Sequence, residues 1–173
     1  RAETRRGWLE TLARYRRDFD QPDSAKYWSP TLECASRDEL RAIQDAKIAA
    51  LTPFLYENSP FYRRRFDRLG LLPSDIRNVG DLARWPVVDK QEMVEDLTAH
   101  PPWGTYTTHD DALWQERGWM MFVSSGTTGA PRPFRYSRID HDYWVWANAR
   151  ALYALGVRKG DRVVSAEVIP AQN

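Results

Sequence analysis

Apolar residues recur at helical spacing along the first half of the chain. One stripe with intervals of four, three and four predicts an amphipathic, peripheral helix over residues 4–19, and it consists of Trp8, Leu12, Tyr15 and Phe19. Turn-forming residues follow at 21–24. Trp28-Ser29-Pro30 then predicts extended chain, because the residue before a proline avoids the helical region. We therefore expect a linker that crosses the surface after the first helix.

Two further helices are predicted from the residues at their ends. Ser36 and Glu39 form a capping box, and the helix that they start continues to about Asn58. Ser59-Pro60 ends this helix and begins the next, which Gly70 closes in a left-handed cap. In the first helix the helical spacing is kept by Leu40, Ile43, Lys47, Leu51 and Phe54, or by Ile48 and Leu55 on the neighbouring row. In the second helix, Phe61, Phe66 and Leu69 face one way.

The middle of the chain shows weaker patterns. Asp89 with Glu92 predicts a short helix that ends near Leu97. Residues 98–118 contain two prolines and two glycines and show no sustained period, so we expect an irregular connection.

The second half alternates short apolar runs with turns. Met120 to Val123 and Phe134 to Tyr136 predict two short strands on either side of a Ser/Thr/Gly loop. Ser137 and Asp140 form another capping box, for a helix that Gly156 closes. A final buried strand is predicted from Val163, Val164, Val168 and Ile169.

This order of elements indicates the fold class α/β. A mainly helical part over residues 1–98 precedes the opening of an α/β layered domain over residues 99–173. The chain begins at Arg1 and stops at Asn173, directly after an apolar stretch, so we expect a fragment that is cut at both ends.

Composition narrows the function classes. A length of 173 residues with 42% apolar residues suits one compact domain, and a net charge of +1 gives no field that would favour nucleic acid or a membrane surface. No apolar run approaches the roughly 20 residues of a membrane span. Cys34 has no partner cysteine for a disulfide or a cysteine-based zinc site, which fits a reducing, cytoplasmic compartment.

The loop SSGTTGAPR carries the clearest chemistry. Its glycines let backbone amides approach a ligand closely, its hydroxyls add donors, and Arg132 adds a planar cation suited to phosphate. The Walker A pattern fails because Pro131 stands where its second glycine belongs, and the Rossmann glycine spacing is absent. From composition alone, a flexible hairpin turn explains the same residues.

Other candidates have a simpler interpretation. His100, His109 and His141 lack metal-ligand spacing, and His109-Asp110-Asp111 fits a solvated loop better than a cation site, so we assign no metal. Arg63, Arg64, Arg65 and Arg68 fit a solvated surface better than a contact with RNA or coenzyme A phosphates. Tyr136, Trp144 and Trp146 could line an aryl pocket, but their helical spacing favours core packing.

The loop resembles the signature of the adenylate-forming superfamily, Ser/Thr-Ser-Gly-Thr-Thr-Gly-x-Pro-Lys, at eight of nine positions. It departs at Arg132, where many members have lysine. The segments YWSPTLE, ENSPFYRRRFDRLGL, DLARWPVVDK and LGVRKGDRVV are similar to phenylacetate-CoA ligases in the same order, over about Tyr27 to Asn173.

The resemblance implies an AMP-forming ligase. Its small-molecule partners would be ATP, an aryl acid such as phenylacetate and coenzyme A, with Mg²⁺ as a further cofactor. The acid is activated to an acyl adenylate and then transferred to coenzyme A. The implied ATP phosphate contacts are Ser124, Ser125, Gly126, Thr127, Thr128, Gly129 and Arg132.

No catalytic acid, base or nucleophile is assigned in this chain. In the family, an acidic magnesium motif, a ribose-binding aspartate and a catalytic lysine lie beyond the equivalent of Asn173. We therefore expect the chain alone to be inactive and to need the remainder of the enzyme or a partner chain, with a homo-oligomer as a further option. Two alternatives stay open: a catalytically silent binding or scaffold module, and an adenylation domain that loads a carrier protein.

Overall fold

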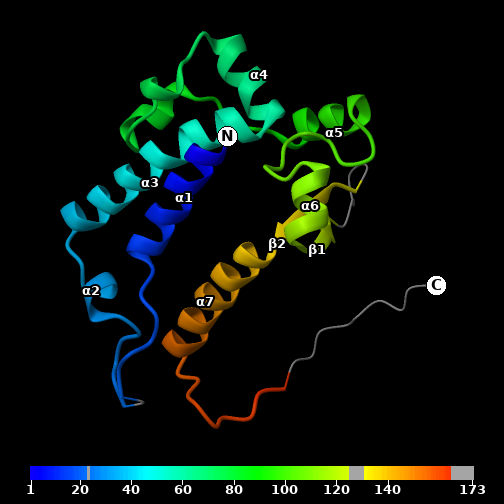
Figure 1. The fold of residues 1–173 in the computed structure, drawn as a ribbon. Coiled ribbons are helices and arrows are strands. Elements are labelled where there is room, and N and C mark those ends of the chain that lie inside the picture. The colour runs from blue at the N-terminus through cyan, green and yellow to red at the C-terminus, as the bar shows by residue number, and fades with distance from the viewer. Residues whose placement is uncertain (23, 125–130, 165–173) are drawn as a thin grey trace.

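The computed structural model describes residues 1–22, 24–124 and 131–164, and it shows helices followed by a hairpin and a last helix (Figure 1). β1 (Gly118–Val123) and β2 (Pro133–Ser137) pair antiparallel, with Val123 opposite Pro133. This confirms the predicted order of a helical front, strand, loop, strand and helix. The helical segments are α1 (Ala2–Tyr15), α2 (Pro30–Glu33), α3 (Arg37–Asn58), α4 (Pro60–Leu69), η1 (Pro73–Asp75), η2 (Gly80–Arg84), α5 (Lys90–Ala99), α6 (Asp111–Arg117) and α7 (Arg138–Ala154).

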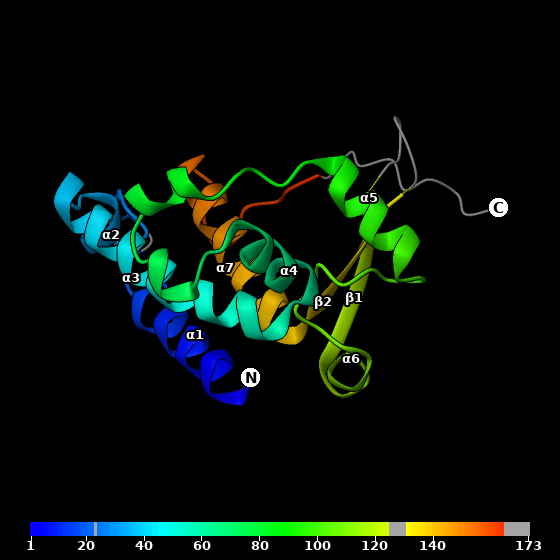
Figure 2. The same ribbon diagram turned by 90° about the horizontal axis from the view of Figure 1, so that it is seen from above.

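Helix α1 packs along α3, as both views show (Figures 1 and 2). The ring of Trp8 stacks on Phe54 at 6.2 Å, and the guanidinium of Arg5 lies 5.3 Å from the same ring. The helix is peripheral as expected, since none of its residues is buried, but the expectation that it reaches residue 19 was wrong. The helix ends at Tyr15, and it helps to cover the buried Phe54.

The predicted caps are confirmed. The Ser36 hydroxyl accepts a hydrogen bond from the Glu39 amide at 3.2 Å, and the Glu39 carboxylate accepts one from the Ser36 amide at 2.7 Å. Ser59 caps α4, and Gly70 ends it with a φ of 62°, a left-handed conformation that side chains with a Cβ rarely adopt. Asp89 begins α5 as expected. These local signals set the helix boundaries in the front of the molecule.

The main core lies where α3 and α4 meet the η1–η2 connection. Phe66 and Ile76 are fully buried there, and Trp85 packs on Phe66 with ring centroids 4.6 Å apart. The hydroxyl of Thr52 donates to the carbonyl of Ile76 at 3.0 Å. Leu69, which we expected on the same face as Phe66, is exposed instead.

Helix α7 begins at the predicted capping box of Ser137 and Asp140 and runs back beneath the helical front (Figure 1). Its far end packs on the chain between α1 and α2. The ring of Phe19 lies 5.0 Å from Tyr153, and the indole of Trp146 donates to the carbonyl of Arg17 at 2.7 Å. The predicted surface linker therefore packs against α7. The linker leads into α2, a short helix that begins at Pro30 because proline is well suited to the first helical position.

Two other expectations from the sequence were wrong. The stretch 98–118 contains α6, whose start is capped by the Asp110 carboxylate accepting from the Leu113 amide at 2.9 Å. Val163 and Val164 are exposed and lie in no strand. The other two residues of the predicted last strand, Val168 and Ile169, lie outside the described residues. Across the described ranges, no helix combines the length and apolar character needed to cross a membrane.

Three of the four arginines join α4 to α5, and the expectation of a solvated surface was wrong for Arg65, whereas Arg64 and Arg68 are exposed. The Arg65 side chain is 4% exposed, pairs with Glu92, and donates to the Pro86 carbonyl at 2.7 Å. Arg64 pairs with the buried carboxylate of Asp96. The remaining two are also engaged: Arg68 lies 3.3 Å from Glu92, and Arg63 donates to the carbonyl of Tyr56.

We expect Glu92→Gln to lower the free energy of unfolding by about 3 kcal/mol, because it removes the counter-ion of a buried guanidinium. Chemical denaturation monitored by circular dichroism measures this change. Glu95→Gln on the same helix is the matched control and should change the stability by less than about 0.5 kcal/mol, since the Glu95 carboxylate is exposed and accepts a hydrogen bond from Gln91 of the same helix. Equal effects of the two substitutions would contradict a structural role for the Arg65–Glu92 pair.

Candidate functional site

The two strands hold both ends of the Ser/Thr/Gly loop. The Ser124 amide donates to the Arg132 carbonyl at 3.1 Å, and the Arg132 amide donates to the Ser124 hydroxyl at 3.0 Å. These two hydrogen bonds close the loop directly after the last strand pair, Val123 and Pro133. Of the predicted phosphate contacts, the structure thus brings Ser124 and Arg132 together. The other five, Ser125, Gly126, Thr127, Thr128 and Gly129, lie outside the described residues.

Arg132 is a cation without a carboxylate partner within the described ranges. One terminal nitrogen of its guanidinium lies 3.7 Å from the sulfur of Met93, and the guanidinium carbon lies 5.9 Å from the ring of Phe134. Its Nε is buried with no hydrogen-bond partner among the described residues. A guanidinium held between a thioether and an aromatic ring keeps its charge available for an anion.

Residues that the sequence analysis did not select also surround the neck of the loop. Met93 comes from α5, and Tyr106 donates its hydroxyl to the Pro133 carbonyl at 2.7 Å. The contact between Tyr106 and Pro133 joins positions 27 apart in the sequence. No capping, spacing or turn signal covers such a separation, so the sequence offered no means of finding it.

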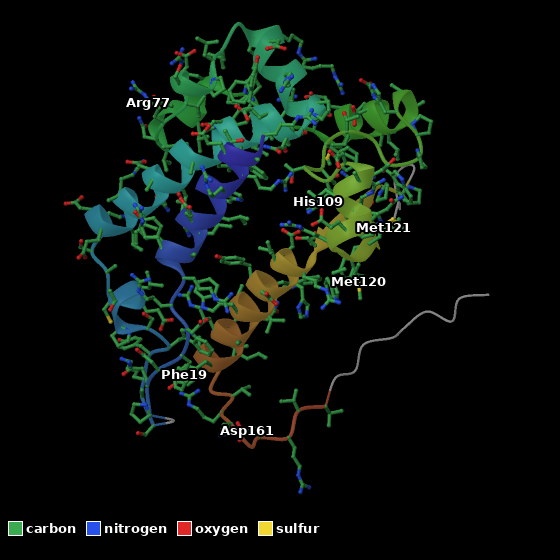
Figure 3. All side chains as sticks on the ribbon, viewed as in Figure 1. Phe19, Arg77, His109, Met120, Met121 and Asp161 are labelled. Carbon is green, nitrogen blue, oxygen red and sulfur yellow. The ribbon has the colours of Figure 1, made fainter. Side chains whose placement is uncertain are left out.

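The His109 side chain is largely buried, so the expectation of a solvated loop at His109-Asp110-Asp111 was wrong for this residue. Its side chain is 10% exposed and borders a cavity of about 310 Å³ between α1, α3, α6 and α7. Burial lowers the pKa of His109, while the Asp140 carboxylate, 3.7 Å away, acts in the opposite direction. Figure 3 shows His109 at the end of α6 that faces α1.

The two aspartates after His109 are engaged separately. Asp110 caps α6, and Asp111 pairs with the buried guanidinium of Arg135 at 2.7 Å. Throughout the residues that the structure describes, no group of three or more His, Cys, Asp or Glu side chains could hold a metal ion. The chain therefore offers no set of magnesium ligands in those ranges.

The three aromatic candidates divide between two places. Tyr136 and Trp144 belong to one cluster with Phe122, whose ring lies 5.3 Å from Tyr136 and 5.0 Å from Trp144. Trp144 is 42% exposed, so the core interpretation was wrong for this residue. Trp146 packs under Arg150 at 4.7 Å and faces the chain after α1 instead. Met120 and Met121 of β1 are also exposed (Figure 3).

The chain is homologous to acid–CoA ligases, and the fold of its described residues is similar to theirs. It is similar to the phenylacetate-CoA ligase of Aromatoleum evansii, with 38% identity over 132 residues, and to that of Escherichia coli K12, with 37% identity over 132 residues. Each match covers 76% of this chain and 28% of the relative. No family model matches the chain.

A solved structure supports the same relationship. The 2-hydroxyisobutyryl-CoA ligase in complex with 2-hydroxyisobutyryl-AMP and coenzyme A superposes with a TM-score of 0.75 and 31% identity, covering 85% of this chain and 30% of the ligase. Its complex with 2-hydroxyisobutyryl-AMP alone gives a TM-score of 0.74 at 28% identity. The chain thus spans less than a third of the length of the ligases that it matches.

The buried imidazole yields a prediction about stability and pH. Because burial lowers the pKa of His109 in the folded state, the unfolded chain binds a proton more readily, and the stability should fall as the pH drops below about 6.5. Thermal unfolding between pH 8 and pH 5 measures this loss. His109→Gln should reduce the pH dependence. A wild-type slope retained in His109→Gln would contradict the assignment.

Proposed function

We propose that this chain is the part of an AMP-forming acid–CoA ligase that binds the phosphates of ATP. The observation that carries the proposal is Arg132, a cation without a carboxylate partner among the described residues, held at the closed neck of a Ser/Thr/Gly loop. The homology to CoA ligases supports it independently. We assign Ser124, Ser125, Gly126, Thr127, Thr128, Gly129 and Arg132 to the phosphate contacts.

The chemistry explains why such a loop is needed. A carboxylate of the substrate attacks the α-phosphorus of ATP, the bond to the bridging oxygen breaks, and pyrophosphate leaves with that electron pair. Donors that hold the β- and γ-phosphates stabilise the charge on the departing pyrophosphate and orient the α-phosphate for attack. The loop thereby positions and neutralises the nucleotide without supplying a nucleophile. Thiol attack of coenzyme A on the acyl adenylate then forms the thioester and releases AMP.

We propose an aryl acid such as phenylacetate as the substrate and coenzyme A as the acceptor. Phenylacetate-CoA ligases match at 36–38% identity, compared with 28–31% for structures of 2-hydroxyisobutyryl-CoA ligase. All of these relatives are named as CoA ligases, which favours coenzyme A over a carrier protein. No step is assigned to magnesium, because the described residues offer no ligand cluster for it.

Acid-dependent exchange of radioactive pyrophosphate into ATP tests the proposal in the complete protein that contains this chain. We expect Arg132→Ala to raise the KM for ATP roughly tenfold or more, because a charge-assisted contact to phosphate is lost, and Arg132→Lys to recover part of it. Thr128→Val should raise the KM for ATP as well. The 173 residues expressed alone should show no exchange.

Arg77→Ala is the matched control for charge removal. Arg77 is exposed in the connection between η1 and η2, across the molecule from Met121 of β1 (Figure 3), and its replacement should leave exchange unchanged. Unaltered KM for ATP and turnover in both Arg132→Ala and Thr128→Val would overturn the proposed function. Binding of a partner chain without any ATP dependence would then support the scaffold alternative.

A further inference from the structure

Tyr106 connects the helical front to the neck of the loop. Its side chain is buried, and its hydroxyl donates to the carbonyl of Pro133, the residue directly after Arg132. Ser124 and Arg132 form a hydrogen-bonded pair, so Val123 and Pro133 form the next, non-hydrogen-bonded pair of the antiparallel ladder. The Pro133 carbonyl therefore points away from β1, and Tyr106 satisfies it from the other side.

The position of Tyr106 is itself tightly determined. Its ring meets Phe61 of α4 edge-on at 6.4 Å and Phe134 of β2 at 5.6 Å. Gly104 has a φ of +65°, and a Cβ on it would lie 2.6 Å from the Tyr106 ring, so only glycine fits. The Asp96 carboxylate accepts from the Thr105 hydroxyl at 2.8 Å. These contacts fix the position of the Tyr106 ring.

Arg132 shares these contacts. Its guanidinium lies 5.9 Å from the ring of Phe134, the same ring that Tyr106 packs against. Burial raises the pKa of the Tyr106 hydroxyl, against the opposing charge of Arg132, so the hydroxyl keeps its proton and remains a donor. A shift of Tyr106 would therefore be transmitted to Arg132 through both the Pro133 carbonyl and the Phe134 ring.

We infer that Tyr106 is a positioning residue for nucleotide binding: its hydroxyl and ring hold the Pro133–Phe134 segment and so place the Arg132 guanidinium for an ATP phosphate. This inference rests on the proposed function of the loop. It assigns to the helical front a role in ATP affinity that does not require contact with ATP.

Tyr106→Phe in the complete protein tests the inference, because it removes only the hydroxyl. We expect the KM for ATP to rise roughly tenfold in pyrophosphate exchange, since a small displacement of a positioning group is costly, while the KM for the acid stays unchanged. A merely structural role would reduce the amount of active enzyme and lower the apparent kcat at constant KM. Tyr56→Phe is the matched control, because its hydroxyl donates to Asp67 within the α3–α4 region.

A second variant keeps the test decisive. Phe134→Leu leaves the Tyr106 hydroxyl bond in place but removes the shared ring, and we expect a smaller rise in the KM for ATP. If Arg132→Ala raises the KM for ATP but neither Tyr106→Phe nor Phe134→Leu does, the positioning role is wrong and the proposed function stands. If Arg132→Ala and Thr128→Val also leave it unchanged, the proposed function fails, and the inference fails with it.

Discussion

The buried carboxylate of Asp96 is the interaction on which the arrangement around the loop depends. Its side chain is 3% exposed, and it accepts hydrogen bonds from Arg64 of α4 and from the amide and hydroxyl of Thr105. A carboxylate removed from water is costly unless such partners surround it. Satisfying this one charge therefore fixes α4 and α5 against the segment that leads to Tyr106, and through Tyr106 against β2.

The helical front consequently belongs to the site and is not a separate accessory. Met93 of α5 lies against the Arg132 guanidinium, and Tyr106 holds the carbonyl that follows Arg132. The chain spans 28–30% of the length of its ligase relatives. Within this length it contains both the predicted phosphate loop and the residues that support the C-terminal end of that loop. A cation in this setting keeps its charge available because its neighbours are a sulfur and an aromatic ring rather than a carboxylate.

Short-range signals in the sequence were sufficient for most of the helices and for the hairpin. The capping boxes at Ser36 and Ser137 and the left-handed Gly70 each act within about four residues, so their outcome depends little on the rest of the chain. The same reasoning missed α6, because the cap at Asp110 stood inside a stretch judged irregular from its prolines and glycines. The loop was recognisable from its composition and its resemblance to a family signature, since both are properties of consecutive residues.

The sequence by itself therefore determined where most of the helices and the two strands of the hairpin begin, and which ligase family the chain resembles, and it predicts which loop contacts phosphate. Only the tertiary structure decided the partners of the charged and aromatic side chains. The sequence indicated a solvated Arg65, but the fold places Glu92 of α5 against it. The sequence likewise gave no sign that the Tyr106 hydroxyl donates to the Pro133 carbonyl. The physical reason is that the burial and pairing of a charge or a hydroxyl depend on its partner in the folded chain. In both contacts that partner is 27 positions away in the sequence, and no local pattern covers such a separation.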